Sequence, residues 1–392
     1  MNRRRAARLA TVLLSAASLL PLAAPAFADS APATAPANSA PTKAPAAAPA
    51  TTDRAALQKA LDEVVADGVP GAVVEVRDAH GTFRATSGVA DLASHRPAKA
   101  EDRFRAGSVT KSFVSTVVLQ LVAEGRLGLD DPIERDLPGV VPNGQNITVR
   151  QLLGHTSGLY DYTNTLLQHP DPIRSARTAT YTPLELIAMA GAHGPLFAPG
   201  TSWSYSNTNY TVLGLLVEHL TGRPLGEEIG RRILRPLHLR DTYFATTPEV
   251  SGPHLNGYEW LDGPGTAPTD LTVFNPSIIW GSGTMVSTTA DLDRFFRALL
   301  GGALLPAGLL DEMRTGRLIG PDARAYGLGL ESRTYCAGTP AWGHSGSVPG
   351  YETFSFTTAD GRRQITLSLN RNLTNAPQTN DAINRVLTAG LC

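Results

Sequence analysis

Lysine is scarce in this sequence. It occurs only at positions 43, 59, 99 and 111, although lysine and arginine together number 34. Acidic residues number 35, so the formal net charge is only −1. A chain without excess positive charge lacks the electrostatic footprint of a protein that binds nucleic acid or an anionic membrane surface, and we expect neither partner. With so few lysines, one that stands beside a reactive side chain is hard to explain by chance.

Two common signatures of hydrolytic sites are also absent. The sequence contains no Gly-x-Ser-x-Gly motif, and the stretches that begin at His155 and His344 do not fit it. No His-Glu-x-x-His motif occurs, and the nine histidines are scattered along the chain. A conventional α/β-hydrolase and a zinc peptidase are therefore not supported, and we expect no metal and no other cofactor.

The N-terminal segment has the features of a secretory signal peptide in the usual order. Arginines at 3–5 precede an apolar stretch at 9–24 and the small-x-small sequence Ala26-Phe27-Ala28. This order predicts a signal peptide over 1–28 and a secreted protein. The alternative is a membrane anchor, but the apolar stretch is short for a span. No later segment is long and apolar enough to cross a bilayer, so we expect no anchor in the mature chain.

The segment that follows, 29–52, consists almost entirely of Ala, Pro, Ser and Thr. It has too little bulky apolar surface to offset the entropy of ordering, which predicts a disordered linker. The remaining residues, 53–392, are enough to bury a large core, as one domain or as two lobes.

Cysteine occurs only twice, at Cys336 and Cys392. An even pair in an exported chain is most simply a disulfide. The alternative is a catalytic thiol, but neither cysteine has a sequence context that supports one.

The spacing of apolar residues predicts an α/β (α+β) fold. Helical spacing is found at 54–67, 112–124, 183–192, 209–220, 226–234, 290–300, 306–314 and 379–389, and strand patterns at 71–77, 82–89, 326–335, 341–344, 353–358 and 364–370. We expect an antiparallel five-stranded sheet flanked by the first and last helices, in a lobe of residues 53–107 and 284–392. Residues 108–283 then form a mostly helical lobe, with the active cleft between the two.

The first candidate motif is Ser108-Val109-Thr110-Lys111, at the start of the clearest predicted helix. A spacing of three residues on a helix brings the serine hydroxyl and the lysine amine within reach of each other. A desolvated lysine can take the proton of a serine nucleophile, and the helix N-terminus favours developing negative charge. The alternative is that Ser108 merely caps the helix.

Two further motifs have the polar groups that such a nucleophile needs. In Tyr205-Ser206-Asn207, the tyrosine can carry a proton if nearby positive charge favours its phenolate, and the Asn207 amide can hold a substrate carbonyl. In 343–347 (GHSGS), a glycine beside hydroxyl residues lets a peptide lie against a strand edge, where backbone N–H groups serve as oxyanion donors. The alternatives are a polar loop that caps the next helix and a Gly/Ser turn with a surface histidine.

Together the three motifs resemble the set of the penicillin-binding proteins and β-lactamases, in the same order along the chain. The resemblance spans 53–392 and is strongest to the actinobacterial exocellular D-Ala-D-Ala carboxypeptidases, with further matches at 104–113 (FRAGSVTKSF), 155–163 (HTSGLYDYT), 205–209 (YSNTN) and 326–330 (YGLGL). It implies a β-lactamase/transpeptidase-like fold and a disulfide between the two cysteines. It also implies catalytic roles for Ser108, Lys111, Tyr205 and His344, and substrate-binding roles for Asn207, Ser345, Ser347 and Trp280.

Three details set this chain apart from its apparent relatives. His344 stands where class C β-lactamases usually have lysine, which resembles the carboxypeptidase branch and leaves less positive charge near Tyr205. The carboxypeptidases have an arginine after Gly-Leu-Gly-Leu that helps to hold the substrate carboxylate, whereas Glu331 stands here. Arg333 shares the strand face of residue 331, so we expect it to act as a substitute. The loop after Trp280, which borders the family's substrate cleft, also looks slightly shorter.

The resemblance implies a monomeric, secreted serine D-Ala-D-Ala carboxypeptidase that cleaves peptidoglycan stem peptides through a Ser108 acyl-enzyme and is acylated by β-lactams. The alternatives on the same fold are a class C-like β-lactamase, a carboxylic-ester hydrolase and a D-aminopeptidase, because one scaffold supports several acyl transfers. Outside enzymes, the fold could be a penicillin-binding sensor module.

Overall fold

The computed structural model describes residues 51–167, 169–320, 324–336, 338–372 and 377–392. The predicted signal peptide over 1–28 and residues 29–50 of the predicted linker lie outside these ranges. Thr52, at the end of that linker, donates its backbone N–H to the Asp78 carboxylate at 2.9 Å. Within the described ranges, no helix combines the length and the hydropathy that a membrane span requires.

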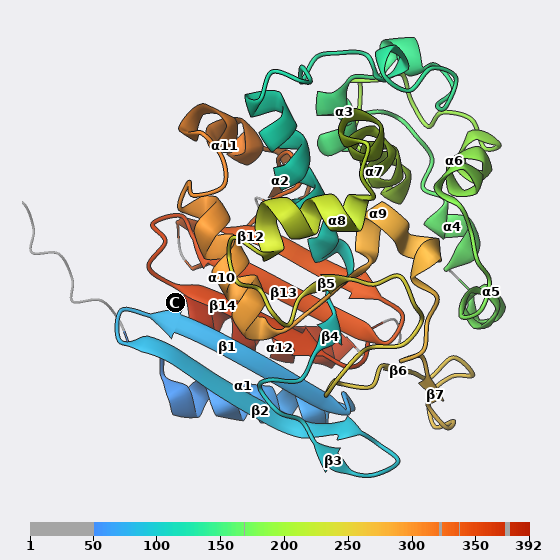
Figure 1. The fold of residues 1–392 in the computed structure, drawn as a ribbon. Coiled ribbons are helices and arrows are strands. Elements are labelled where there is room, and N and C mark those ends of the chain that lie inside the picture. Colours follow the sequence, from blue (N-terminus) through green and yellow to red (C-terminus); the bar gives the residue numbers. More distant parts are fainter. Residues whose placement is uncertain (1–50, 168, 321–323, 337, 373–376) are drawn as a thin grey trace, which may run out of the picture. The chain divides into compact units, whose positions relative to one another are not determined.

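An antiparallel sheet forms the centre of the fold (Figure 1), with strand order β3-β2-β1-β14-β13-β12-β11-β10-β9. Its strands are β1 (Gly71–Asp78), β2 (Gly81–Asp91), β3 (Arg96–Pro97), β9 (Arg317–Leu318), β10 (Ala325–Tyr326), β11 (Glu331–Cys336), β12 (Thr339–Val348), β13 (Tyr351–Thr358) and β14 (Gln364–Leu369). The described residues thus form nine strands in this sheet, and the expected number of five is wrong. Three of the nine contain only two residues, which is too short to leave an alternating pattern in the sequence.

The expected strand at 326–335 is two strands. The chain turns back between β10 and β11, where Gly329 has a φ of +84° and the Gly327 N–H donates to the Leu330 carbonyl oxygen at 2.8 Å. Glycine adopts this conformation without steric cost, so the Gly-Leu-Gly-Leu sequence forms a tight hairpin instead of continuing the strand.

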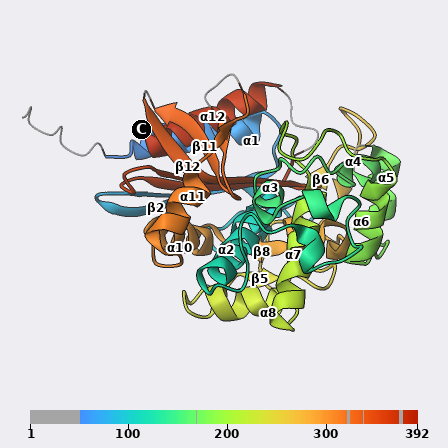
Figure 2. The ribbon, with the colours of Figure 1, turned by 90° about the horizontal axis from the view of Figure 1, so that it is seen from above.

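Helices cover both faces of the sheet, as the view from above shows (Figure 2). The described helices are α1 (Arg54–Ala66), α2 (Thr110–Ala123), α3 (Val149–Leu153), α4 (Thr163–Leu166), α5 (Pro170–Ala176), α6 (Pro183–Gly191), α7 (Asn207–Thr221), α8 (Leu225–Ile229), α9 (Trp280–Gly283), α10 (Thr289–Leu300), α11 (Ala307–Arg314) and α12 (Pro377–Leu391). The first and last, α1 and α12, pack on one face, and α2 and α10 lie on the other (Figure 2). The β-lactamase/transpeptidase-like α/β fold expected from the sequence is confirmed.

Local sequence explains why α1 and its neighbours form. The Asp53 carboxylate caps α1 by accepting from the backbone N–H groups of residues 55 and 56, both at 3.0 Å. Leu57, Leu61 and Val64 then bury one helix face against the sheet. A two-residue turn joins β1 and β2, with Asp78 paired to Gly81, so the strands predicted at 71–77 and 82–89 form a hairpin.

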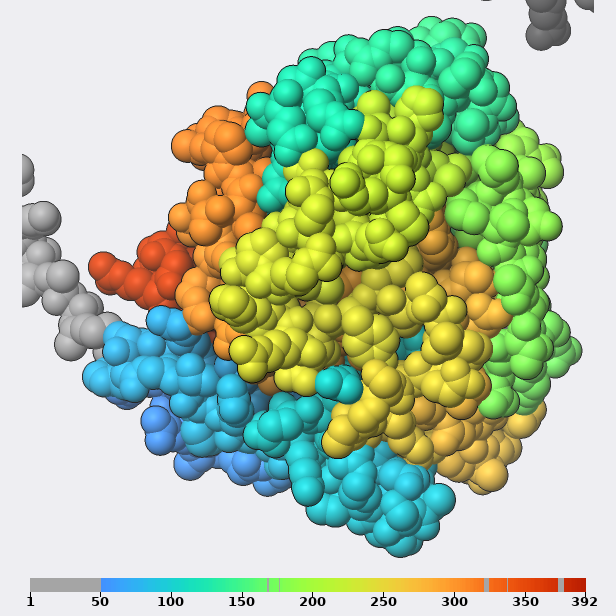
Figure 3. Space-filling model, viewed as in Figure 1, coloured from blue at the N-terminus to red at the C-terminus, as the bar shows by residue number. Residues whose placement is uncertain are grey.

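The second face of the sheet is covered by α10 and by residues 108–283, which we call the helical region. Helix α2 is the first long helix of this region. Phe113 of α2 stacks on Phe295 of α10 with ring centroids 3.7 Å apart. Figure 3 shows that residues of the helical region, coloured teal to yellow, cover the C-terminal strands on this side, whereas the β1–β2 hairpin stays at the surface. The start of α2 is therefore held against the middle of the sheet.

Two small sheets lie within or beside the helical region. One has the order β4-β8-β5 and consists of β4 (Phe104–Arg105), β5 (Tyr243–Phe244) and β8 (Met285–Ser287), and the other pairs β6 (Tyr258–Glu259) with β7 (Thr269–Asp270). Strand β4 leads directly into the turn before α2, and the Ala106 N–H donates to the Met285 carbonyl oxygen at 2.9 Å. The β4-β8-β5 sheet therefore fixes the position of the turn in which the first candidate motif, Ser108 to Lys111, begins.

Candidate active site

Ser108 lies in a single 3₁₀ turn, Gly107–Val109, that runs into α2. The turn sits directly against β12. A Cβ atom at position 346 would lie only 1.9 Å from the Ala106 carbonyl oxygen, so Gly346 is required for the strand to approach the turn this closely. The first and third candidate motifs thus meet, as the sequence predicted.

The Lys111 amine is in hydrogen-bond contact with the hydroxyl of Ser108. Its Nζ donates to Ser108 Oγ at 3.0 Å, to Asn207 Oδ1 at 2.7 Å and to the Ser282 carbonyl oxygen at 2.9 Å. Lys111 is fully buried, and this burial lowers its pKa to about 7, against the opposing effect of nearby carboxylates. A large fraction of the amine is therefore neutral near neutral pH and can accept the Ser108 proton.

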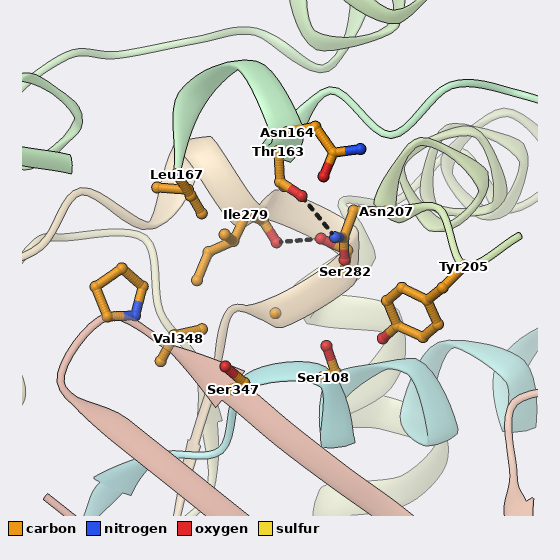
Figure 4. Close-up of a pocket in the computed structure, with 12 residues that line it drawn as sticks. Ser108, Thr163, Asn164, Leu167, Tyr205, Asn207, Ile279, Ser282, Ser347 and Val348 are labelled. Carbon is orange, nitrogen blue, oxygen red and sulfur yellow. Dashed lines mark hydrogen bonds between the residues drawn. The ribbon is translucent and has the colours of Figure 1, made fainter. Parts of the chain in front are cut away.

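The Tyr205 hydroxyl points toward Ser108 at one side of the pocket (Figure 4), and Lys111 Nζ lies 4.7 Å from the centre of the Tyr205 ring. Burial raises the pKa of Tyr205 well above its usual value, while a hydrogen bond with Ser108 acts in the opposite direction. The phenolate, which the sequence made conditional on nearby positive charge, is therefore disfavoured. A protonated Tyr205 can still pass a proton between the serine oxygen and a leaving group.

His155, which the sequence did not single out as a site residue, holds the loop of Tyr205 in place. Its ring Nδ1 accepts from the Ser206 N–H at 3.2 Å, and its carbonyl oxygen accepts from the Ser204 N–H at 3.1 Å. The ring itself packs against Tyr205, with centroids 4.3 Å apart. Burial lowers the pKa of His155 well below its usual value, so the ring is neutral and its Nδ1 can act as an acceptor.

Asn207 connects Lys111 to two residues that the sequence motifs did not identify. Its Nδ2 donates to Asp161 Oδ2 at 2.9 Å and to Thr163 Oγ1 at 3.1 Å, so both of its N–H groups have acceptors. A substrate carbonyl that binds this amide, as the sequence predicted, has to displace one of them. Both residues belong to the 155–163 stretch, which was noted for its resemblance and not for the roles of its side chains.

His344 is close to the site but lies beneath it. Its side chain is fully buried, its Nε2 lies 3.0 Å from the Tyr326 hydroxyl, and its Nδ1 lies beside the Ser345 carbonyl oxygen. Burial lowers the pKa of His344 to about 4, so it is neutral at neutral pH. It therefore supplies no positive charge to Tyr205 there, and its catalytic role stays a prediction.

Arg333 does not line the pocket. Its guanidinium donates to Glu331 Oε2 at 2.8 and 3.0 Å and lies over the rings of Phe354 and Phe356. These phenylalanines belong to the core between the sheet and helices α1 and α12. Alternation correctly puts residues 331 and 333 on one strand face, but that face packs against these helices and away from Ser108.

Ser345 shares this environment. Its hydroxyl donates to Glu331 Oε1 at 2.8 Å and accepts from Arg333 at 2.8 Å, and Arg324 completes the group with a 3.0 Å bond to Glu331. The arginines hold the pKa of the buried Glu331 carboxyl near 2, against the effect of its burial. The expected substrate-binding hydroxyl of Ser345 is thus engaged in an internal ion-pair network.

Ser347 does reach the pocket, which has a volume of about 230 Å³ (Figure 4). Its hydroxyl accepts a hydrogen bond from Asn372 Nδ2, a second contact that the sequence did not indicate. The pocket is lined by Ser108, Thr163, Asn164, Leu167, Tyr205, Asn207, Ile279, Ser282, Gly283, Ser347, Val348 and Pro349. Trp280 is not one of these, because its ring packs against Gly214 of α7.

Two backbone N–H groups meet at the junction of the turn and β12. A Cβ atom on Gly107 would lie 2.8 Å from the Ser347 nitrogen, and one on Gly346 would lie 3.1 Å from the Ser108 nitrogen. Backbone donors in this position can bind the oxyanion that forms when the serine attacks a carbonyl. Together with Lys111 and Tyr205, they give the site the parts needed for acyl transfer through a serine ester.

The described residues contain no group of three or more His, Cys, Asp or Glu side chains arranged to hold a metal ion. The two cysteines form a disulfide, Cys336–Cys392, which ties the end of β11 to the last residue of the chain. The pair expected from the sequence is therefore present in the structure.

Comparison with known proteins agrees with this geometry. The family model named Beta-lactamase matches residues 57–390. A D-stereospecific amidohydrolase from Streptomyces sp. superimposes with a TM-score of 0.79 at 41% identity, covering 87% of this chain and 99% of the other. Penicillin-binding protein 4* of Bacillus subtilis is 28% identical over 75% of this chain, and a D-aminopeptidase of Cereibacter sphaeroides is 29% identical over 81%. The alignments span 66% and 60% of the lengths of these two relatives. Because the family model covers nearly all of the described residues, the chain belongs to the beta-lactamase family of serine hydrolases.

Proposed function

We propose that this protein is a secreted serine amidohydrolase that cleaves amide bonds of D-amino acid derivatives whose leaving group is uncharged. The observation that carries the proposal is the charge of the pocket. Among the described residues that line it, none has a charged side chain. Arg333, the cation expected from the sequence, is paired with Glu331, as is Arg324.

A D-Ala-D-Ala carboxypeptidase, the function expected from the sequence, must bind a free carboxylate at this end of the substrate. Burying a carboxylate without a charged or hydrogen-bonded partner is costly, and the cation predicted to pair with it, Arg333, is committed elsewhere. The carboxamide of an amide substrate is uncharged and needs no cation as a partner. The similarity to a D-stereospecific amidohydrolase also supports an amide substrate in place of a peptide with a free carboxylate.

The walls of the pocket support a substrate with an apolar side chain. Leu167, Ile279, Val348 and Pro349 form one part of the lining, and hydroxyl and amide groups form the rest. In the proposed reaction, Ser108 Oγ attacks the carbonyl carbon and its proton moves to Lys111 Nζ. The leaving nitrogen is protonated through Tyr205, and water then hydrolyses the Ser108 ester.

The decisive experiment uses two substrates that differ in one group, acyl-D-Ala-D-Ala and its C-terminal carboxamide. For the purified mature chain we expect kcat/KM for the carboxamide to exceed that for the free acid by at least about tenfold, since leaving a buried polar group unpaired costs about 1–3 kcal/mol and a charged group costs more. Faster release of D-alanine from the free acid would favour the carboxypeptidase instead. The L-enantiomer of the carboxamide serves as the control for stereospecificity.

Secretion, the monomeric state and acylation by β-lactams stay predictions that accompany this proposal. The similarity to penicillin-binding proteins supports recognition of β-lactams and of peptides of the peptidoglycan type. Mass spectrometry of protein collected from the culture medium should find Asp29 at the N-terminus if the predicted signal peptide is cleaved there.

A further inference from the structure

A chain of hydrogen bonds leads from a buried carboxylate to the nucleophile. Asp161 Oδ2 accepts from Asn207 Nδ2 at 2.9 Å, Asn207 Oδ1 accepts from Lys111 Nζ at 2.7 Å, and Lys111 Nζ lies 3.0 Å from Ser108 Oγ. Asp161 is only 6% exposed and does not line the pocket. Its carboxylate therefore acts on the reaction through the residues that it contacts and through its charge.

We propose that Asp161 is a positioning residue: it holds the Asn207 amide with its oxygen toward Lys111 and thereby keeps the lysine amine at the nucleophile. An amide has a donor end and an acceptor end. If Asn207 rotated by half a turn, its NH₂ group would face the Lys111 amine and its oxygen would face the Asp161 carboxylate. The amide oxygen would then repel the Asp161 carboxylate, and the NH₂ group would repel a protonated Lys111, so the carboxylate selects one orientation. The proposal rests on the serine hydrolase site and not on the substrate preference proposed above.

Asp161 is itself held in place by Thr163, two residues further along the chain. Its Oδ1 accepts from the Thr163 backbone N–H at 3.0 Å and from Thr163 Oγ1 at 2.8 Å. The same Thr163 hydroxyl accepts the second N–H of Asn207, at 3.1 Å. Asp161 and Thr163 thus accept the two N–H groups of the Asn207 amide. Thr163 also lines the pocket (Figure 4).

The charge of Asp161 gives this role a measurable signature. Burial lowers the pKa of Lys111, whereas the negative charges of Asp161 and Glu331 raise it. The other titratable groups that face Lys111 are His155 and His344, which interact with it electrostatically, and Tyr205 and Tyr210, whose rings lie beneath its amine. Because neutral Lys111 is the base, the rise of kcat/KM with pH should follow its pKa.

The test is the pH profile of kcat/KM for p-nitrophenyl acetate, which requires acylation of Ser108 but no D-amino acid. Asp161→Asn removes the charge with little change of shape, so the acidic limb should move down by about one pH unit. Its kcat should fall about tenfold, because the Asn207 amide loses its fixed orientation. Asp171→Asn, at a fully solvated site, is the control and should change neither quantity. An Asp161→Asn enzyme with the wild-type limb would overturn the proposal.

A second pair of variants separates orientation from charge and serves if Asp161→Asn does not fold. Thr163→Val removes the hydroxyl that holds both Asp161 and Asn207 but keeps the carboxylate charge. We expect kcat to fall about fivefold with the acidic limb unmoved, and Thr163→Ser to restore kcat. Undiminished kcat in Thr163→Val would contradict the orienting role. A wild-type enzyme that hydrolyses the ester but no D-amide would refute only the proposed substrate class.

Discussion

Replacing Arg333 tests whether this arginine belongs to the substrate site or to the interior of the protein. Arg333→Ala removes two hydrogen bonds to Glu331, one to Ser345 and the contact with the Phe354 and Phe356 rings. Breaking a buried ion pair typically costs about 3–5 kcal/mol. Arg324 remains as a partner of Glu331, so we expect the low end, about 3 kcal/mol, and a fall in Tm of about 4 °C for a folded region of this size.

The assay combines a thermal melt with the matched acid and carboxamide substrates. Arg333→Ala should lower Tm and should change kcat/KM for both substrates by the same small factor, because the guanidinium contacts neither. Arg385→Ala, which breaks a half-exposed surface pair with Glu63, should cost at most about 1 kcal/mol and serves as the control. An Arg333→Ala protein with unchanged Tm and a selective loss of activity on the free acid would refute the reasoning. The arginine would then hold the substrate carboxylate.

Three further predictions follow from the structure. Benzylpenicillin should add its mass to the peptide that contains Ser108 and to no peptide of Ser108→Ala, and a label on another serine would contradict the assignment of the nucleophile. Replacing Cys336 and Cys392 together by serine should lower the free energy of unfolding by about 4 kcal/mol in the chain-entropy model, and an unchanged denaturation midpoint would argue against this. His344 is neutral in the fold down to about pH 4 but protonates near pH 6.5 when unfolded, so its contribution to stability is complete above pH 6.5 and is lost as the pH falls to 4. In His344→Gln, the free energy of unfolding should therefore fall by up to about 3 kcal/mol less than in the wild type between pH 6.5 and pH 4. An equally steep fall in both proteins would exclude His344 as the cause.

Local features of the site could be read from the sequence because they depend on few residues. Ser108 and Lys111 are three positions apart at the start of a helix, and the structure brings their side-chain atoms to 3.0 Å. Likewise, α1 and the β1–β2 hairpin follow from apolar spacing and a turn, and their observed bounds differ from the predicted ones by at most two residues. In these cases, the periodicity of neighbouring residues determines the result.

Long-range relations could not be read in this way. Alternation correctly assigned Arg333 to the face of residue 331, but nothing in the strand says which face turns toward the cleft. Asp161 lies 46 positions before Asn207, and a contact over that distance leaves no local pattern. The Gly329 hairpin was missed because the apolar residues on both sides of it read as one strand. Each of these depends on tertiary packing.

The substitution of a carboxylate at position 331 affects more than one residue of this site. A buried glutamate is stable only if cations neutralise it, and Glu331 takes Arg333 and Arg324 for that purpose. Arg333, which the sequence suggested as the cation for a substrate carboxylate, is thus paired with Glu331. None of the described residues that line the pocket has a charged side chain, and the nearby His344 is neutral at neutral pH. Arginine at 331 alone would set three guanidinium groups side by side on a strand face that is turned away from Ser108, so this replacement should destabilise the fold without adding a cation to the pocket.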